Sequence, residues 1–377
     1  MIYFDAGATT LQKPEAVGRA MYQAVSTLSS PGRGSYPATR RAEETDLQCR
    51  LAAAELFGVE DPERVVFTSC ATHGLNIAIR TLVRPGSRVV ISGYEHNAVT
   101  RPLHAIPDVE LVVADGPLFD PAAMVEQFRR ALERRADAVI CTHVSNVFGY
   151  ALPVAEIAAL CREKGVPFVL DASQSAGVLP VHMASLGAAF IAMPGHKGLY
   201  GPQGTGLLLC GSDPAPLLYG GTGSQSLLQA MPRELPDRLE AGTHNMPGIA
   251  GLLEGLRFVQ RRGVDAIAAH ESELGRYAAR RLAEIPGVEV FAGPAQTGVV
   301  SFRAAGRDCE ELGEALAARG IALRAGLHCA PLAHRTAGTL ETGTVRFSPS
   351  VFNRRQEVDA LVRETARAVG QTAKAGG

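Results

Sequence analysis

Short runs of apolar residues recur at intervals between residues 64 and 210. They lie at 65–67, 89–91, 111–113, 138–140, 168–170, 190–192 and 207–209. Continuous apolar runs of this length are typical of strands covered on both faces. Longer amphipathic segments, such as 121–132 and 154–161, separate several of these runs. The alternation predicts an α/β fold with a largely parallel sheet.

The pattern changes after residue 210. A stretch dense in glycine and proline, 211–247, is followed by a helical pattern at 249–259. Further on, the sequence predicts strands at 288–290 and 299–302 and helices at 309–318 and 356–369. These elements indicate a second, smaller α+β unit. We expect a large α/β domain over 15–250 and a small domain formed by 1–14 and 251–377.

Composition narrows the class of protein. The chain has 377 residues, of which 46% are hydrophobic and 20% charged, so it can bury a large core. Its net charge is −1 and its basic residues are spread out, which argues against nucleic acid as a partner. The first residues, Met1–Asp5, lack the features of a secretory signal or membrane anchor. We expect a cytoplasmic protein, with no membrane contact, that acts on small molecules or proteins.

The cysteines do not form a recognisable metal or redox motif. There are seven of them, widely spaced and without a Cys-x-x-Cys pair. We expect reduced thiols that are mostly packed as small apolar residues, and no bound metal.

Candidate chemistry begins with one lysine. Lys197 lies in the glycine- and proline-rich stretch Pro194–Gly204, and Asp171 ends the apolar run 168–170. In parallel sheets ligands gather at the carboxyl ends of the strands, where both residues fall. Taken singly, a lysine is usually solvated and such an aspartate usually caps a turn. Together they suit pyridoxal phosphate, whose aldehyde forms a Schiff base with lysine and whose ring nitrogen needs a carboxylate.

Two further segments fit the same cofactor. Ser69–Asn76 follows a predicted strand and opens a predicted helix, so its backbone N–H groups and the Thr72 hydroxyl favour a phosphate. A simple capped helix start remains the alternative for this segment. His96 follows the run 89–91, where an imidazole could lie flat on a pyridine ring, although most lone histidines are structural.

Seven short stretches together resemble the cysteine desulfurases of the class V aminotransferase superfamily, across nearly the whole chain. They are Asp5–Thr10, Glu95–Asn97, Ser145–Gly149, Asp171–Gln174, Gly195–Lys197, Glu240–Thr243 and Arg324–Cys329. Gly-His-Lys by itself indicates the superfamily. The Arg-x-Gly-x-His-Cys stretch points to the desulfurases, and to the branch with a short cysteine loop. The resemblance implies the fold of the fold-type I PLP-dependent transferases, with the catalytic cysteine loop on the small domain.

The resemblance also implies a role for individual residues. Lys197 would hold pyridoxal 5′-phosphate as a Schiff base and Asp171 would pair with its ring nitrogen. Gln174 would reach the ring hydroxyl, while His96 would stack on the ring and carry a proton. Cys329 would be the nucleophile. The phosphate would be bound by Ala71, Thr72, His196 and Thr243. The substrate carboxylate would be bound by Asn146, Arg324 and Arg346.

The implied reaction converts L-cysteine to L-alanine and leaves a persulfide on Cys329. We expect a homodimer, because Thr243 resembles a residue that reaches the partner's phosphate, and a protein sulfur acceptor, for example in iron–sulfur cluster assembly. His328, a nearby cation or substrate binding must help to ionise the thiol. L-selenocysteine stays open as a substrate. The alternatives are an aminotransferase, a cysteine or selenocysteine lyase, and a non-catalytic cofactor-binding protein.

Three positions depart from the family pattern. Pro194 and Ala71 stand where relatives carry hydroxyl residues, which predicts a thinner shell around the phosphate. Leu327 replaces the first of two histidines before the cysteine, which puts in doubt a proton relay through that position.

Overall fold

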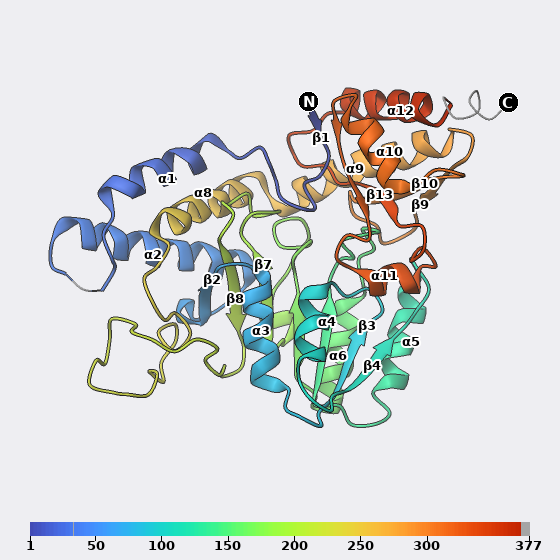
Figure 1. Ribbon diagram of the computed structural model, residues 1–377. Coiled ribbons are helices and arrows are strands. Elements are labelled where there is room, and N and C mark those ends of the chain that lie inside the picture. The colour runs from blue at the N-terminus through green and yellow to red at the C-terminus, as the bar shows by residue number, and fades with distance from the viewer. Residues whose placement is uncertain (33, 371–377) are drawn as a thin grey trace.

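The computed structural model describes residues 1–32 and 34–370, so the end of the expected small domain, 371–377, lies outside the described residues. Within the described part, the largest sheet has seven strands in the order β2-β8-β7-β6-β5-β3-β4 (Figure 1). Their bounds are β2 Val65–Thr68, β3 Arg88–Ser92, β4 Glu110–Ala114, β5 Ala138–Thr142, β6 Phe168–Asp171, β7 Phe190–Pro194 and β8 Gly206–Cys210. Strands β3 to β7 pair in parallel, and β8 runs antiparallel to both β2 and β7. The predicted, largely parallel sheet is therefore confirmed.

Both faces of this sheet are covered, as the continuous apolar runs predict. Val89 and Ile91 of β3 pack on one side in a cluster with residues of α3 and α4. Val90 between them packs on the other side in a cluster with residues of α5 and α6. Successive side chains of a strand point to opposite faces, so an unbroken apolar run serves two cores at once. The helices are α3 Ala71–Leu82, α4 Asn97–His104, α5 Pro121–Ala131, α6 Val154–Lys164 and the short α7 Met183–Leu186; η1 Pro62–Arg64 precedes β2.

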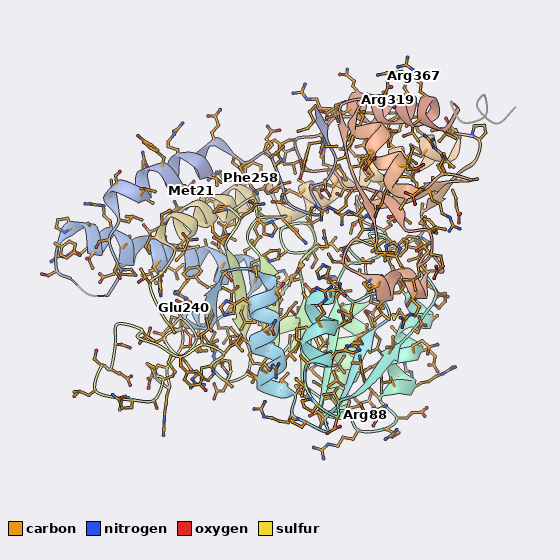
Figure 2. The ribbon with its side chains drawn as sticks, in the orientation of Figure 1. Met21, Arg88, Glu240, Phe258, Arg319 and Arg367 are labelled. Carbon is orange, nitrogen blue, oxygen red and sulfur yellow. The ribbon has the colours of Figure 1, made fainter. Side chains whose placement is uncertain are left out.

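Four longer helices lie beside the sheet or connect it to the C-terminal part. They are α1 Glu15–Thr27, α2 Pro37–Phe57, α8 Met246–Arg262 and α9 Val264–Ala283. Helix α8 packs against α1 and α2, and Met21 of α1 lies over it (Figure 2). A Cβ at Gly251 would come within 2.8 Å of Met21 Cγ, so the glycine permits this close approach. The expected domain boundary after residue 250 falls inside α8, and the division into two domains stays a prediction.

The C-terminal part contains the second, antiparallel sheet. Its four strands have the order β12-β13-β10-β9 within the described residues. The bounds are β9 Val288–Phe291, β10 Val300–Ala304, β12 Arg324–Gly326 and β13 Thr344–Phe347, with helices α10 Cys309–Ala317, α11 Pro331–Thr336 and α12 Arg355–Gly370. Strand β1, Ile2–Tyr3, pairs in parallel with β11, Ile321–Ala322. The predicted α+β pattern is confirmed, while β12 and β13 had not been predicted.

Among the described residues, no helix combines the length and the apolar character that crossing a bilayer requires.

Candidate active site

A cavity of about 230 Å³ lies where the carboxyl ends of the parallel strands meet the second sheet. The residues that the sequence predicted for the site line this cavity, with the exception of Thr243. They are Ala71, Thr72, His96, Asn146, Asp171, Gln174, His196, Lys197, Arg324, Cys329 and Arg346. The topology thus brings together side chains that are separated by more than half of the chain.

Lys197 follows β7 in a loop that the N-terminal segment holds in place. The preceding carbonyl, that of His196, accepts hydrogen bonds from the Thr10 backbone N–H at 3.1 Å and from Lys13 Nζ at 2.9 Å. Burial lowers the pKa of the Lys197 amine to about 8, and the nearby Arg346 guanidinium acts in the same direction. About a tenth of this amine is therefore neutral, and nucleophilic, at pH 7, far more than for an ordinary lysine.

Asp171 is the last residue of β6, and its carboxylate is buried beside the Lys197 loop. Only 2% of the residue is exposed, and the Ser173 backbone N–H donates to its Oδ1 at 2.9 Å. Pairing of Asp171 with Ala192 places the ends of β6 and β7 next to each other. This geometry suits a carboxylate that pairs with a protonated ring nitrogen in the cavity.

His96 caps the start of α4 with its side chain. The Ala98 backbone N–H donates to His96 Nδ1 at 3.0 Å, so Nδ1 is an acceptor and a neutral ring carries its hydrogen on Nε2. Burial lowers the pKa of His96, and the positive charges of Lys197 and Arg346 contribute to the same shift. The structure therefore presents a neutral imidazole of defined tautomer to the cavity.

The beginning of α3 suits a phosphate group. Cys70 at its N-cap forms no side-chain capping bond in the described structure, which leaves the N–H groups of Ala71 and Thr72 for another acceptor. His196 Nδ1 is buried with no hydrogen-bond partner among the described residues. Burial lowers the pKa of His196 to about 4. A bound dianion would accept hydrogen bonds from the free N–H groups of Ala71 and Thr72 at this helix N-terminus.

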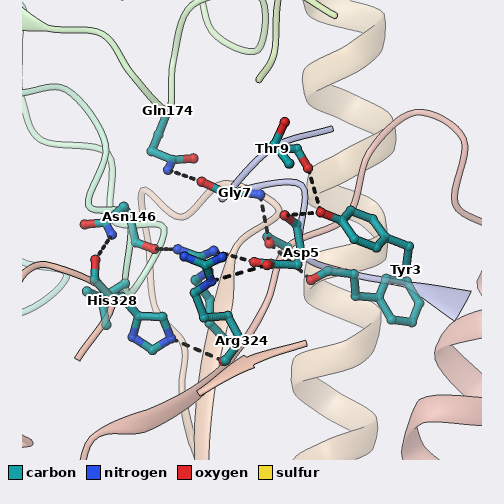
Figure 3. Close-up of polar contacts among 12 residues, drawn as sticks. Tyr3, Asp5, Gly7, Thr9, Asn146, Gln174, Arg324 and His328 are labelled. Carbon is teal, nitrogen blue, oxygen red and sulfur yellow. Dashed lines mark hydrogen bonds and ion pairs between the residues drawn. The ribbon is translucent and has the colours of Figure 1, made fainter. Parts of the chain in front are cut away.

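Arg346 is held by two partners, one of which the sequence had not assigned (Figure 3). Its Nη2 lies 2.7 Å from Asp5 Oδ1, and its Nη1 donates to the Asn146 carbonyl at 2.9 Å. Asp5 also pairs with Arg324, whose Nε lies 3.3 Å from Oδ2. Arg346 Nε and Asn146 Oδ1 are buried without a partner among the described residues. These free polar atoms indicate that the cavity is built for a polar ligand.

Cys329 lies in a tight turn between β12 and α11. The Ala330 N–H donates to the Leu327 carbonyl at 2.9 Å, and the two central residues, His328 and Cys329, have φ values of 52° and 55°. Positive φ at both central positions is typical of a type I′ turn and is strained for these residue types. Cys329 is exposed, which confirms the loop predicted for it.

The strained turn is secured from outside. The Asn97 backbone N–H donates to the Cys329 carbonyl at 2.8 Å, and Asn146 Nδ2 donates to the His328 carbonyl at 2.8 Å. Of the other cysteines, Cys70 is partly buried and the rest are buried, as the sequence predicted.

Thr243 lies away from this cavity. It is exposed on the segment after β8, where it lines another cavity together with Glu240 and His244. The structure of one chain therefore does not bring it to the Lys197 cavity, and its expected contact with a partner's phosphate stays a prediction.

The sequence reasoning missed several residues that shape the site. Asp5 and Asn97 belong to stretches that carried the resemblance, but no role had been given to either. His334 and Thr339, which lie behind the cysteine turn, were signalled by no pattern in the sequence. Their relation to His328 depends on the fold.

A lysine amine, a strand-end carboxylate and an uncapped helix start around one cavity suit a pyridoxal-phosphate enzyme. The family described as Aminotransferase class-V matches residues 2–361, and the chain belongs to this family.

Within the family, the chain is similar to proteins named as cysteine desulfurases. It is 36% identical to a probable cysteine desulfurase of Mycolicibacterium paratuberculosis, over 97% of this chain and 55% of that protein. The chain thus spans about half the length of that relative. It is 31% identical to a probable cysteine desulfurase of Methanothermobacter thermautotrophicus, over 96% of this chain and 92% of the relative. An apo structure of cysteine desulfurase from Thermococcus onnurineus has a TM-score of 0.88 and 29% identity, covering 98% of this chain and 95% of that one.

Proposed function

We propose that this chain is a pyridoxal-phosphate-dependent cysteine desulfurase, which converts L-cysteine to L-alanine and collects the sulfur on Cys329. The observation that carries the proposal is that Lys197 and Cys329 line the same cavity. An aminotransferase or a lyase needs the lysine but has no need for a thiol. The names of the relatives support the same activity.

The described residues fit the cofactor. Lys197 would hold it covalently, Asp171 would face its ring nitrogen, and Gln174 and His96 would lie at the ring. Ala71, Thr72 and His196 would bind its phosphate. When bound, pyridoxal phosphate supplies an electron-withdrawing ring that makes the substrate Cα proton removable.

The chain's own residues would then carry out the proton and sulfur transfers. Lys197, whose pKa of about 8 makes its amine an available base, takes the Cα proton. The Cys329 thiolate attacks the substrate sulfur, so an S–S bond forms as the substrate Cβ–S bond breaks. His96 is the candidate for the second proton carrier, since its neutral ring has a defined tautomer. The products are alanine and a persulfide on Cys329.

The substrate carboxylate would be bound on the arginine side of the cavity. Arg346 offers its unpaired Nε, and Asn146 offers the second hydrogen of Nδ2, whose first is donated to the His328 carbonyl. Arg324 is close by and partly exposed. A guanidinium held in place by Asp5 needs little reorganisation when an anion arrives. This arrangement would orient L-cysteine with its sulfur toward Cys329.

Partners are also part of the proposal. A homodimer would place Thr243 near the partner's cavity, and its segment carries exposed apolar residues, Tyr219, Leu227 and Leu228. Because Cys329 is exposed, a persulfide there would be accessible to a protein acceptor, with iron–sulfur cluster assembly as one destination. A cytoplasmic location stays a prediction.

The test is product analysis with L-cysteine under reducing conditions, after loading with pyridoxal phosphate. We expect alanine and sulfide in equal amounts from the unmodified protein, and loss of at least about 100-fold in rate for Cys329→Ala. Cys70→Ala is the matched control, because Cys70 lines the same cavity, and it should retain turnover.

Other products would contradict the proposal in specific ways. Pyruvate and ammonia would indicate a lyase. Amino transfer to a 2-oxo acid would indicate an aminotransferase, and full turnover by Cys329→Ala would remove Cys329 as sulfur acceptor. Bound cofactor without turnover would indicate a binding protein. Parallel assays with L-selenocysteine would decide the preferred substrate.

A further inference from the structure

Three buried side chains lie in a line behind the cysteine turn. Thr339 Oγ1 is 2.7 Å from His334 Nδ1, and His334 Nε2 is 3.3 Å from His328 Nδ1. The other ring nitrogen of His328, Nε2, lies 3.2 Å from the Arg324 carbonyl. Exposure is 1% for Thr339, 0% for His334 and 7% for His328, so water has little access to this chain of contacts.

The donor and acceptor in each of these hydrogen bonds can be worked out from the Arg324 carbonyl at one end of the row. A carbonyl oxygen only accepts, so His328 Nε2 must carry a hydrogen and donate it to Arg324. In a neutral ring Nδ1 then accepts, which requires a hydrogen on His334 Nε2. His334 Nδ1 is left as an acceptor, and the Thr339 hydroxyl donates to it. The Thr339 hydroxyl also lies 3.5 Å from the His334 carbonyl, a longer contact than the 2.7 Å to Nδ1. With His328 neutral, one arrangement of hydrogens satisfies the ring contacts.

The surroundings keep His328 neutral. Burial lowers its pKa well below the usual value, and positive charge on Arg346 of β13, Arg324 of β12 and His334 of α11 acts in the same direction, which outweighs the opposing effect of the hydrogen bond to the Arg324 carbonyl. Protonation of Nδ1 would also direct a second hydrogen at His334 Nε2, which already donates. Both ring nitrogens of His328 are therefore occupied.

Packing fixes the same three residues. The rings of His328 and His334 are nearly parallel, with centroids 5.6 Å apart and an angle of 10° between their planes, as an edge-to-edge hydrogen bond between ring nitrogens requires. Phe148 contacts the other ring, that of His334, at a centroid distance of 5.8 Å. The Thr339 backbone N–H donates to the His334 carbonyl at 2.8 Å, which closes the turn after α11.

We infer that His334 and Thr339 are positioning residues, which lock His328 in one neutral tautomer and thereby hold the strained turn that presents Cys329. His328 then supports the turn structurally and does not act as the base that deprotonates the Cys329 thiol. The sequence left three ways of ionising Cys329 open: His328, a nearby cation and substrate binding. With His328 removed, the cations of the cavity and substrate binding remain. The inference rests on the proposed function in taking Cys329 as the sulfur acceptor.

The tautomer can be measured directly on the cofactor-loaded protein. In ¹⁵N NMR spectra of histidine side chains at neutral pH, His328 should show a protonated Nε2 and an unprotonated Nδ1. Assignment would use the loss of signals in His328→Asn and His334→Asn. A doubly protonated His328, or a hydrogen on Nδ1, would overturn the inference, and neither result depends on turnover.

A matched pair of variants tests the consequence. Thr339→Val keeps the volume but removes the hydroxyl donor, whereas Thr339→Ser keeps the donor. We expect kcat with L-cysteine to fall about tenfold in Thr339→Val, with KM changed less than about twofold, because only the thiol is misplaced. Thr339→Ser should restore kcat to within about twofold of the original.

Unchanged kcat in Thr339→Val, or an equal loss in both variants, would overturn the inference. Thermal unfolding and the visible spectrum of the bound cofactor separate a local change from loss of the fold. If the unmodified protein itself forms no alanine, the proposed function fails, while the NMR result still decides whether His328 is locked.

Discussion

At the scale of the residue, two lysines show that the surroundings of an amine decide whether a lowered pKa makes it reactive. Burial lowers the pKa of Lys13 and of Lys197 to about 8 in each case. The Lys13 amine is already engaged, since it donates to Thr10 Oγ1 at 2.5 Å and to the His196 carbonyl at 2.9 Å. Lys197 instead lines the cavity, where its amine is available to a ligand. A shifted pKa thus marks a reactive lysine only when the amine is also accessible.

This difference predicts where pyridoxal phosphate attaches and how attachment depends on pH. After borohydride reduction, peptide mass spectrometry should find the cofactor on Lys197 and not on Lys13. The rate of attachment should rise toward pH 8 and then level off, because the neutral amine reacts. Each unit below about pH 8 should lower that rate about tenfold.

Lys197→Ala should show no attachment, and the exposed Lys164→Ala serves as the control that keeps it. Covalent cofactor on another lysine in the unmodified protein, or a rate independent of pH across this range, would contradict the assignment.

At the scale of the element, a buried ion-pair network joins α2 to β2 and to the segment before α8. Arg50 contacts Asp46 at 2.8 Å and Glu240 at 2.6 Å, and its guanidinium lies 4.2 Å from the centre of the Phe67 ring. Glu240, labelled in Figure 2, also accepts from the Phe67 backbone N–H at 2.6 Å. Asp46, Glu240 and His244 have the spacing of a metal site, but Arg50 already compensates the carboxylate charges.

Removing the central cation should be costly. Arg50→Met would leave Asp46 and Glu240 as buried carboxylates with too little positive charge, and we expect it to lower the free energy of unfolding by about 3–4 kcal/mol. Urea denaturation measures this change. The control is Glu126→Gln, which breaks exposed pairs on α5 and should cost less than about 1 kcal/mol. A similar small loss for both variants would show that the network is not stabilising.

The elements also show how far sequence alone could predict this fold. Strands β2 to β8 were predicted because each contains an unbroken apolar run. Most of them are buried on both faces, whereas β4 lies at the edge of the sheet and leaves Val113 37% exposed. Strand β13 was not, because Thr344 and the buried Arg346 interrupt that pattern. β12 is only three residues long.

The site shows the same limit. Asp171 and Lys197 could be located from local patterns, since each follows an apolar strand. Arg346 was assigned by resemblance only, and its partner Asp5 lies 341 positions away. The contacts of His334 arise from packing between α11 and the cysteine turn, which has no periodic signature.

At the scale of the whole molecule, exposed apolar side chains gather on two segments. Leu227 is 97% exposed and Tyr219 76% on the segment between β8 and α8, while Tyr22 and Val25 are exposed on α1. Both segments lie at the left of the molecule in Figure 1. Apolar groups in such numbers favour burial against another chain.

We therefore predict a homodimer of twice the chain mass of 39.7 kDa, measured by light scattering. The double variant Leu227→Glu and Leu228→Glu should shift the protein toward the monomer, because it places charges in the contact. It should also weaken cofactor retention if Thr243 completes the partner's phosphate site. Val113→Glu, on edge strand β4 at the other side of the molecule, should leave the dimer intact. A monomer for the unmodified protein would contradict the prediction.

The N-terminal segment has a consequence for how the protein is made. β1 pairs with β11, and Asp5 joins Arg346 to Arg324, so Asp5 meets partners that follow it in the chain by 341 and 319 positions. The arginine side of the cavity can therefore assemble only once β13 has been synthesised. A nascent chain stalled before β13 would already carry Lys197 and the ends of β6 and β7 but would lack Arg346, so we expect the two sides of the cavity to form at different times during translation.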